Sequence, residues 1–157
     1  MVPRFKFGAM VSTEEKLVTM MGWGVDPAEE LKFSGISNLI SEGRMVEPGK
    51  REIVMGAGLL KKIDKKVGDK VTFLYNTAFD SLQASTFQVV GKIQSSIELL
   101  NDNVFYLPLD QVNSILEMHG EVTELLIVTR DYHKADSELS FIRELFIDKD
   151  PSGKYYL

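Results

Sequence analysis

Apolar and polar residues alternate along short segments through most of the chain, a pattern typical of half-buried β-strands. The first segment covers residues 4–11, where four apolar side chains share one face and Arg4, Lys6 and Gly8 lie on the other. A polar turn follows, and residues 16–21 form a second predicted strand. Because so short a turn joins the two segments, we predict a β-hairpin near the start of the chain.

Short strands also dominate the middle of the chain. The alternation predicts strands over residues 52–55, 71–75, 86–93 and 103–107. In the third of these, the apolar positions from Phe87 to Ile93 are expected to share one face, Gly91 included. Residues 122–129 are apolar on both faces at their centre, so we predict a strand in the middle of a sheet.

Four helices are predicted between these strands. Asp26 followed by Pro27 and two acids is typical of a helix N-cap and first turn. Residues 59–63 and 109–116 have helical spacing, and residues 135–146 give the clearest helix, with apolar residues spaced by four, three and four. The whole is an α+β fold of seven or eight strands, in which the β-rich middle suggests a lobe inserted into a discontinuous outer lobe.

Composition narrows the classes of function. The chain has 157 residues, 44% of them hydrophobic and 26% charged, as in ordinary globular proteins. Its net charge of −5 argues against nucleic acid as a partner, because phosphate binding needs a clustered positive field. The absence of cysteine excludes disulfides and thiolate metal sites. No apolar run approaches the roughly 20 residues that span a bilayer, and no signal-peptide pattern opens the sequence.

The sequence offers no catalytic constellation. The two histidines, His119 and His133, have no metal-ligand spacing, and there is no Gly-x-Ser-x-Gly elbow. Gly56 and Gly58 follow a predicted strand, but the third glycine and the closing acid of a dinucleotide fingerprint are missing. Close approach of the backbone to a neighbour explains these glycines better. We therefore predict no catalytic, cofactor-binding or metal-binding residues, and a protein that is not an enzyme.

Two further side-chain groups have ordinary explanations. Two pairs of acids have the residue types of acid–base carboxylates: Asp102 with Glu98, and Asp64 with Asp69. Nothing in the sequence buries these acids, so solvated loop acids are the favoured interpretation. Trp23, between two glycines, is either a docking aromatic or a core residue that closes the hairpin, and the second interpretation is favoured.

Several short motifs occur in a particular order along the chain. They are Pro3-Arg4-Phe5, Ala9-Met10-Val11-Ser12, Gly24-Val25-Asp26-Pro27, Gly43-Arg44, Glu52-Ile53-Val54-Met55-Gly56, Val67-Gly68-Asp69-Lys70-Val71, Phe87-Gln88-Val89-Val90-Gly91 and Val104-Phe105-Tyr106-Leu107-Pro108-Leu109. Each motif alone is weak, but their order and spacing are fairly specific. The succession resembles the extracytoplasmic core domain of ABC-transporter permeases of the MacB/LolC/LolE/FtsX type, over residues 3–156.

The resemblance implies a two-lobed, MacB-like periplasmic core domain. Residues 1–44 and 121–157 would form a porter-like α/β lobe, shortened at its start, and residues 45–120 an inserted β-rich lobe. In the family this domain lies between the first two membrane helices of a four-helix permease. Family members begin earlier and continue further than this chain, so the sequence looks like a piece of a larger membrane protein.

The resemblance also implies a function. ATP would bind a separate cytoplasmic ATPase subunit, and no cofactor is expected in this domain. The parent permease would be a dimer in the cell membrane, with this domain on the extracytoplasmic side. The domain would couple ATP-driven helix motion to movement or release of a substrate or partner, such as a peptide, a lipoprotein or a protein.

Five apolar residues in predicted loops are the candidate contacts for such a partner. They are Phe79, Leu82, Ile97, Leu99 and Leu100. Exposed apolar loops contact partners more often than average surface does, although packing back onto the lobe is an equal alternative.

Two other functions remain as alternatives. A free-standing β-rich ligand- or protein-binding module predicts a closed concave pocket. A hydrolase that uses a carboxylate or a serine predicts a strongly perturbed acid, or a Ser–His contact in a cleft.

Overall fold

The computed structural model describes residues 2–128 and 139–144, and the chain divides into two compact units, Met1–Leu126 and Ile127–Leu157. The strands of the first unit are β1 (Val2–Ser12), β2 (Leu17–Val25), β3 (Ile40–Gly43), β4 (Glu52–Gly56), β5 (Lys70–Asn76), β6 (Leu82–Ile93), β7 (Val104–Pro108) and β8 (Glu124–Leu126). Its helices are α1 (Pro27–Phe33), the 3-10 helix η1 (Ile36–Asn38), α2 (Ala57–Lys62), α3 (Glu98–Asp102) and α4 (Leu109–Leu116). The mixed α/β class is confirmed.

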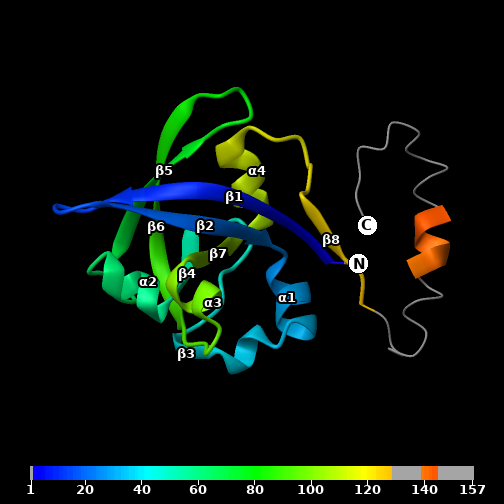
Figure 1. The fold of residues 1–157 in the computed structure, drawn as a ribbon, viewed down its shortest axis with the longest axis horizontal. Coiled ribbons are helices and arrows are strands. Elements are labelled where there is room, and N and C mark those ends of the chain that lie inside the picture. The colour runs from blue at the N-terminus through cyan, green and yellow to red at the C-terminus, as the bar shows by residue number, and fades with distance from the viewer. Residues whose placement is uncertain (1, 129–138, 145–157) are drawn as a thin grey trace. The chain divides into compact units, whose positions relative to one another are not determined.

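Six strands of the first unit form a sheet that closes on itself (Figure 1). The strand order is β2-β7-β4-β6-β5-β1, and β1 then pairs with β2 over nine residue positions to complete the ring. The pairs β2–β7 and β4–β6 are parallel, and the other pairs of the ring are antiparallel. The closure depends on long-range pairing that the spacing of strands along the sequence does not indicate.

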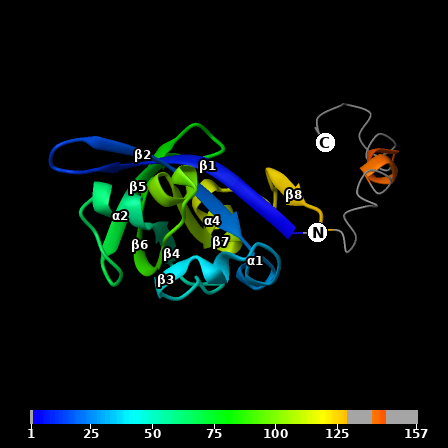
Figure 2. The ribbon, with the colours of Figure 1, turned by 60° about the horizontal axis from the view of Figure 1, so that its bottom comes forward.

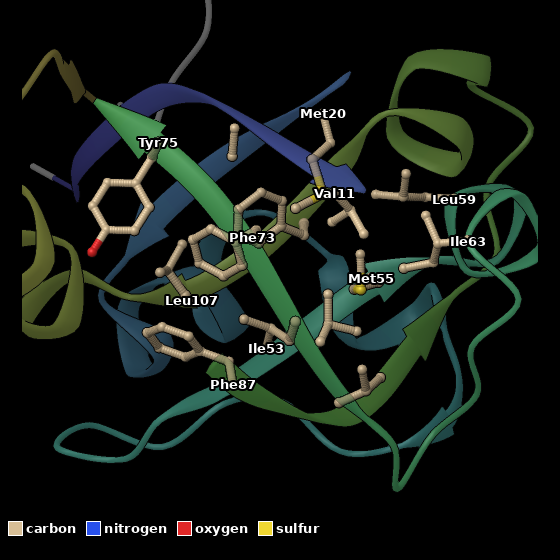
Figure 3. Close-up of a cluster of buried hydrophobic side chains, with 14 of the residues drawn as sticks. Val11, Met20, Ile53, Met55, Leu59, Ile63, Phe73, Tyr75, Phe87 and Leu107 are labelled. Atoms are coloured by element: carbon tan, nitrogen blue, oxygen red, sulfur yellow. The ribbon is translucent and has the colours of Figure 1, made fainter. Parts of the chain in front are cut away.

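Aromatic side chains fill the inside of this ring (Figure 3). The Phe73 ring centroid lies 5.3 Å from that of Phe87 and 5.0 Å from that of Phe105, and all three side chains are fully buried. Leu59 of α2 and Val112 of α4 pack against the same cluster. The period of two in β7 directs Phe105 and Leu107 inward, while Val104 and Tyr106 join a second cluster beneath η1 on the outer face. Both faces of β7 are therefore buried.

One extra residue in β6, Val90, changes the face of the sheet on which the later side chains of the strand lie. Ile53 of β4 pairs with Val89, but the next residue, Val54, pairs with Gly91, so Val90 is an extra residue in β6. Such a bulge reverses the alternation beyond it. Phe87 and Val89 therefore lie in the inner cluster and Ile93 in the outer one, and the prediction of one shared face is wrong.

The predicted central strand over residues 122–129 is also wrong in part. Its regular portion is only β8, which ends the strand order and pairs with β1 alone among the described residues; residue 129 lies outside them. β8 pairs with β1 at Val2–Arg4, and no described strand pairs with the other side of β8, so it is an edge strand. Leu125 is accordingly 41% exposed.

Other local predictions are confirmed. β1 and β2 form the predicted hairpin, and the Asp26 carboxylate accepts hydrogen bonds from the backbone N–H groups of Ala28 and Glu29 at the start of α1. Of the predicted helix over residues 135–146, residues 139–144 are helical and the rest lie outside the described residues. The division into residues 1–44 with 121–157 and residues 45–120 stays a prediction. In the described part of the chain, no helix has the length and apolar character needed to cross a bilayer.

Candidate partner-binding cleft

Trp23 projects from the outer face of the closed sheet because its neighbours Gly22 and Gly24 pack closely against interior side chains. A Cβ atom on Gly22 would lie 2.5 Å from the Phe7 ring, and one on Gly24 would overlap Val112 of α4. Since side chains alternate along a strand, two inward glycines place the residue between them on the opposite face. The Gly-Trp-Gly sequence thus keeps the interior tightly packed and leaves a half-buried indole outside.

A buried ion pair lies beside the indole. The Arg4 guanidinium of β1 donates from Nε to Glu30 Oε2 at 3.1 Å and from Nη2 to Glu30 Oε1 at 2.7 Å. Glu30 is 1% exposed. The Lys6 ammonium lies 4.6 Å from the Trp23 ring centroid, and the Arg4 guanidinium carbon lies 5.7 Å from it. Both cations are in range for attraction to the indole face.

Tyr106 of β7 completes the group. Its ring meets the Trp23 ring edge-on, with centroids 5.4 Å apart and planes at 70°. Burial raises the pKa of the Tyr106 phenol above its usual range, and the Glu30 carboxylate raises it further. The Trp23 Nε1 atom is buried and has no hydrogen-bond acceptor among the described residues. A buried donor without an acceptor costs free energy.

These side chains surround a small open cleft of about 140 Å³. It is lined by Arg4, Trp23, Glu30, Ser34, Ile36, Leu39, Leu100 and Tyr106. The volume is on the scale of a single medium-sized side chain rather than of a whole ligand. One wall is apolar and the other carries an ion pair, so the cleft suits one residue of a partner protein or peptide. We refer to it as the Trp23 cleft.

The structure separates the five predicted contact residues into two places. Phe79 lies in the turn between β5 and β6, and Leu82 begins β6. Ile97 caps α3, and Leu99 and Leu100 lie within it, so this stretch is a short helix and not the predicted loop. The first four are exposed, from 50% for Leu99 to 70% for Phe79. Leu100 packs against the outer cluster and lines the Trp23 cleft.

The two groups lie at opposite ends of β6. Its 12 residues, at about 3.3 Å each, span up to roughly 40 Å. One small ligand therefore does not touch both groups. The Ile97–Leu100 stretch lies next to the Trp23 cleft, whereas Phe79 and Leu82 form a separate apolar tip. A role in partner contact stays a prediction for all five residues.

Enzymatic chemistry finds no support in the described residues. They contain no group of three or more His, Asp or Glu side chains placed to hold a metal ion. His119 is exposed, and His133 lies outside the described residues. The Asn101 side-chain amide, and then Lys62, hold the pKa of Asp102 below its usual value, as expected for a charged carboxylate and not for a proton donor. A Cβ on Gly56 would overlap the Asn101 carbonyl, which confirms the close-approach interpretation of that glycine.

Sequence reasoning missed most of the cleft. Arg4 and Glu30 are 26 residues apart, and nothing local links a strand arginine to an acid in the first turn of α1. The sequence singles out Trp23 but not the residues around it. The one usable signal was the Gly-Trp-Gly sequence, because two inward glycines in a strand imply an outward indole.

The chain matches a protein-family model and solved structures. The family model for the MacB-like periplasmic core domain matches residues 2–137. The chain is similar to the extracellular domain of the noncanonic ABC-type transporter YknZ from Gram-positive bacteria, with a TM-score of 0.67 and 13% identity over 96% of this chain and 75% of that one. It is also similar to a domain of a permease protein from Porphyromonas gingivalis, with a TM-score of 0.44 and 12% identity over 92% of this chain and 63% of that one. No curated protein matches the sequence.

The family match covers nearly the whole chain, including every strand of the closed sheet, the Trp23 cleft and both groups of predicted contact residues. The likeness to the YknZ domain supports the same fold. The chain therefore belongs to the family of MacB-like periplasmic core domains, the extracytoplasmic domains of ABC-transporter permeases.

Proposed function

We propose that this domain moves as a rigid body with the helices of its permease and passes that movement to a substrate or partner outside the membrane. A cytoplasmic ATPase subunit would drive the helices, and this domain would hold no cofactor. The partner would be a protein, a peptide or a lipoprotein. The division of the chain into a porter-like lobe and a β-rich lobe, and the dimeric state of the parent permease, belong to the same proposal.

One observation carries the proposal: the two ends of the first unit lie side by side. Val2 of β1 pairs with Leu126 of β8, at the same end of the unit (Figure 1). A unit whose first and last strands are paired follows movement applied at that end as one body if its interior does not deform. The closed sheet and its packed aromatic interior provide that stiffness, because close-packed cores transmit strain instead of absorbing it.

The partner-contact surface in this proposal includes the Trp23 cleft with its neighbours Ile97, Leu99 and Leu100. The exposed apolar residues of α3 would surround one anchoring side chain in the cleft, as at the centre of many protein interfaces. Phe79 and Leu82 at the tip of β5 and β6 would make a second contact.

Spin-label distances in the reconstituted permease with its ATPase test the proposal. One label pair, at Phe79→Cys and Ile97→Cys, reports the shape of the domain, and a second pair joins Phe79→Cys to a cysteine in a membrane helix. Between the nucleotide-free and ATP-bound states, we expect the first distance to stay the same and the second to change. The reverse result, with internal deformation and no movement relative to the membrane, would refute rigid-body coupling.

A further inference from the structure

The β1–β2 hairpin extends beyond the closed sheet as an arm with an unpaired edge (Figure 2). β2 pairs with β7 only from Met21 to Val25. Over Leu17–Met20 its sole strand partner in the described part of the chain is β1. This stretch of β2 therefore has one side available for another strand.

The direction of the backbone groups along this edge follows from two hydrogen bonds. Thr13 N–H donates to the Lys16 carbonyl at 2.9 Å, so the backbone groups of Lys16 point toward β1 and those of the next residue, Leu17, point away from it. Met21 N–H donates to the Asn103 carbonyl at 2.8 Å, on the side away from β1. Because alternate residues of a strand direct their backbone groups to the same side, those of Leu17 and Thr19 also point away from β1. Neither has a backbone partner there among residues 2–128 and 139–144.

The side chains along the edge do not protect it. Val18 and Met20 are buried with α2 on the inner face of the arm. On the outer face, Leu17 is 54% exposed and Met21 is 39% exposed. Natural proteins usually block such edges with a charge, a proline or a bulge, and Leu17–Met21 contains none of these. An open apolar edge of this kind is a risk of aggregation unless it has a use.

A groove of about 1000 Å³ lies between the end of the arm, at the turn that precedes the open edge, and α2. Lys61 of α2 and Lys65, three residues after the helix ends, line it and have no ion-pair partner among the described residues. Lys62 beside them pairs with Asp102 at 3.2 Å. Acids line the groove as well: Glu14 and Glu15 lie at the turn of the arm, beyond the end of the open edge, and Asp64 lies between Lys61 and Lys65 in the sequence. On the α2 side the lysines Lys61, Lys62 and Lys65 outnumber the acids Asp64 and Asp102.

We infer that the open edge of β2 binds an extended, acidic segment of a partner protein as an added strand. The segment would bond to the backbone of Leu17 and Thr19. Its alternate residues would be apolar, beside Leu17 and Met21, and acidic on the other face, toward Lys61 and Lys65. Strand addition of this type combines backbone affinity with side-chain selection. The inference stands on the edge alone and holds whether or not an ATPase moves the domain.

Amide hydrogen exchange of the full 157-residue chain tests this directly. The probe is the acetylated peptide amide Val-Glu-Val-Glu-Val-Glu-Val, and the control peptide has lysine in place of each glutamate. We expect the glutamate peptide to slow exchange of the Leu17 and Thr19 amides at least tenfold. The lysine peptide should bind at least tenfold more weakly, because it meets Lys61 and Lys65.

Matched variants separate the backbone contribution from the charge contribution. Thr19→Pro removes an N–H that faces away from β1, so the hairpin should survive while binding is lost; Thr19→Val keeps the N–H and should bind normally. Lys61→Glu with Lys65→Glu should weaken binding at least tenfold. Lys70→Glu, at the exposed start of β5, should not change it.

Three results would overturn the inference. One is no slowing of exchange at Leu17 and Thr19 at a peptide concentration of several millimolar, a test that requires no variant to fold. Another is equal binding of the lysine peptide. The third is protection of the same amides that rises with protein concentration without peptide, which would identify a second copy of this chain as the occupant.

Discussion

Removing the Glu30 carboxylate should strongly destabilise the domain, because it leaves the Arg4 charge largely buried without its partner. Glu30 holds Arg4 through two hydrogen bonds of 3.1 and 2.7 Å, and its own exposure is 1%. Breaking a buried pair from one side costs about 3–5 kcal/mol. Glu124 lies 4.0 Å from the Arg4 guanidinium and gives some compensation, so we expect the lower end of that range for Glu30→Leu.

Urea unfolding followed by Trp23 fluorescence measures this cost, since Trp23 is the only tryptophan of the chain. With a urea dependence of about 1.5–2 kcal/mol per molar, a loss of about 3 kcal/mol lowers the unfolding midpoint by about 1.5–2 M. The slope should stay unchanged, because the substitution does not alter the surface exposed on unfolding.

The double variant Arg4→Met with Glu30→Leu is the decisive control. Replacing a whole buried pair with apolar side chains is often neutral or stabilising, so the double variant should recover most of the lost stability. The reasoning is refuted if Glu30→Leu costs less than about 1 kcal/mol, or if the double variant is no more stable than the single one. Either result would mean that water screens the pair more than its burial indicates.

Three further predictions concern packing and pH. Gly24→Ala should destabilise the domain by about 1–3 kcal/mol, because the added methyl group overlaps Val112 of α4. Gly8→Ala should not, because a Cβ at that position has no atom within 4 Å, and thermal unfolding of the two variants makes the comparison. The Arg44 side chain hydrogen-bonds Glu52 and lowers the pKa of the Glu52 carboxyl. The pair therefore stabilises the fold above the ordinary glutamate pKa, and this stabilisation is lost as the pH falls through the lowered pKa of Glu52. Glu52→Gln should therefore flatten the acid limb of a stability–pH curve, and an unchanged limb would contradict this. The raised pKa of Tyr106 stabilises the fold below pH about 10, and this contribution is lost at higher pH; Tyr106→Phe should reduce the alkaline loss measured by urea unfolding.

Local sequence patterns predicted the elements well where a short-range physical rule governs them. The hairpin follows from two alternating segments joined by a polar turn, and α1 follows from an N-cap acid before a proline. The extra residue Val90 in β6 carries no such signal, because it is defined by its pairing with β4. The same is true of residues 122–129, whose apolar character predicts a central strand although β8 is at the edge and pairs with β1 alone among the described strands.

The candidate site was less predictable than the fold because its parts come from distant segments. The sequence leaves exposure or inward packing open for Phe79 and Leu99, and the structure shows both exposed, Leu99 on a short helix and not in a loop. The sequence did not show that a strand of up to roughly 40 Å separates them. Nor did it show that Leu100 turns inward to meet Trp23 at the cleft.

The geometry of β1 connects the proposed function with the proposed strand-addition edge. This strand starts at Val2, where the unit's two ends are paired, and ends at Ser12, next to the turn of the arm. Its 11 residues span roughly 36 Å, and it pairs with β2 along most of that length. Movement applied at Val2 would therefore reach the open edge of β2 through a continuous hydrogen-bonded ribbon. Because the hydrogen bonds of an antiparallel pair run perpendicular to the strands, a partner strand added at Leu17 and Thr19 would be pulled across several backbone hydrogen bonds at once.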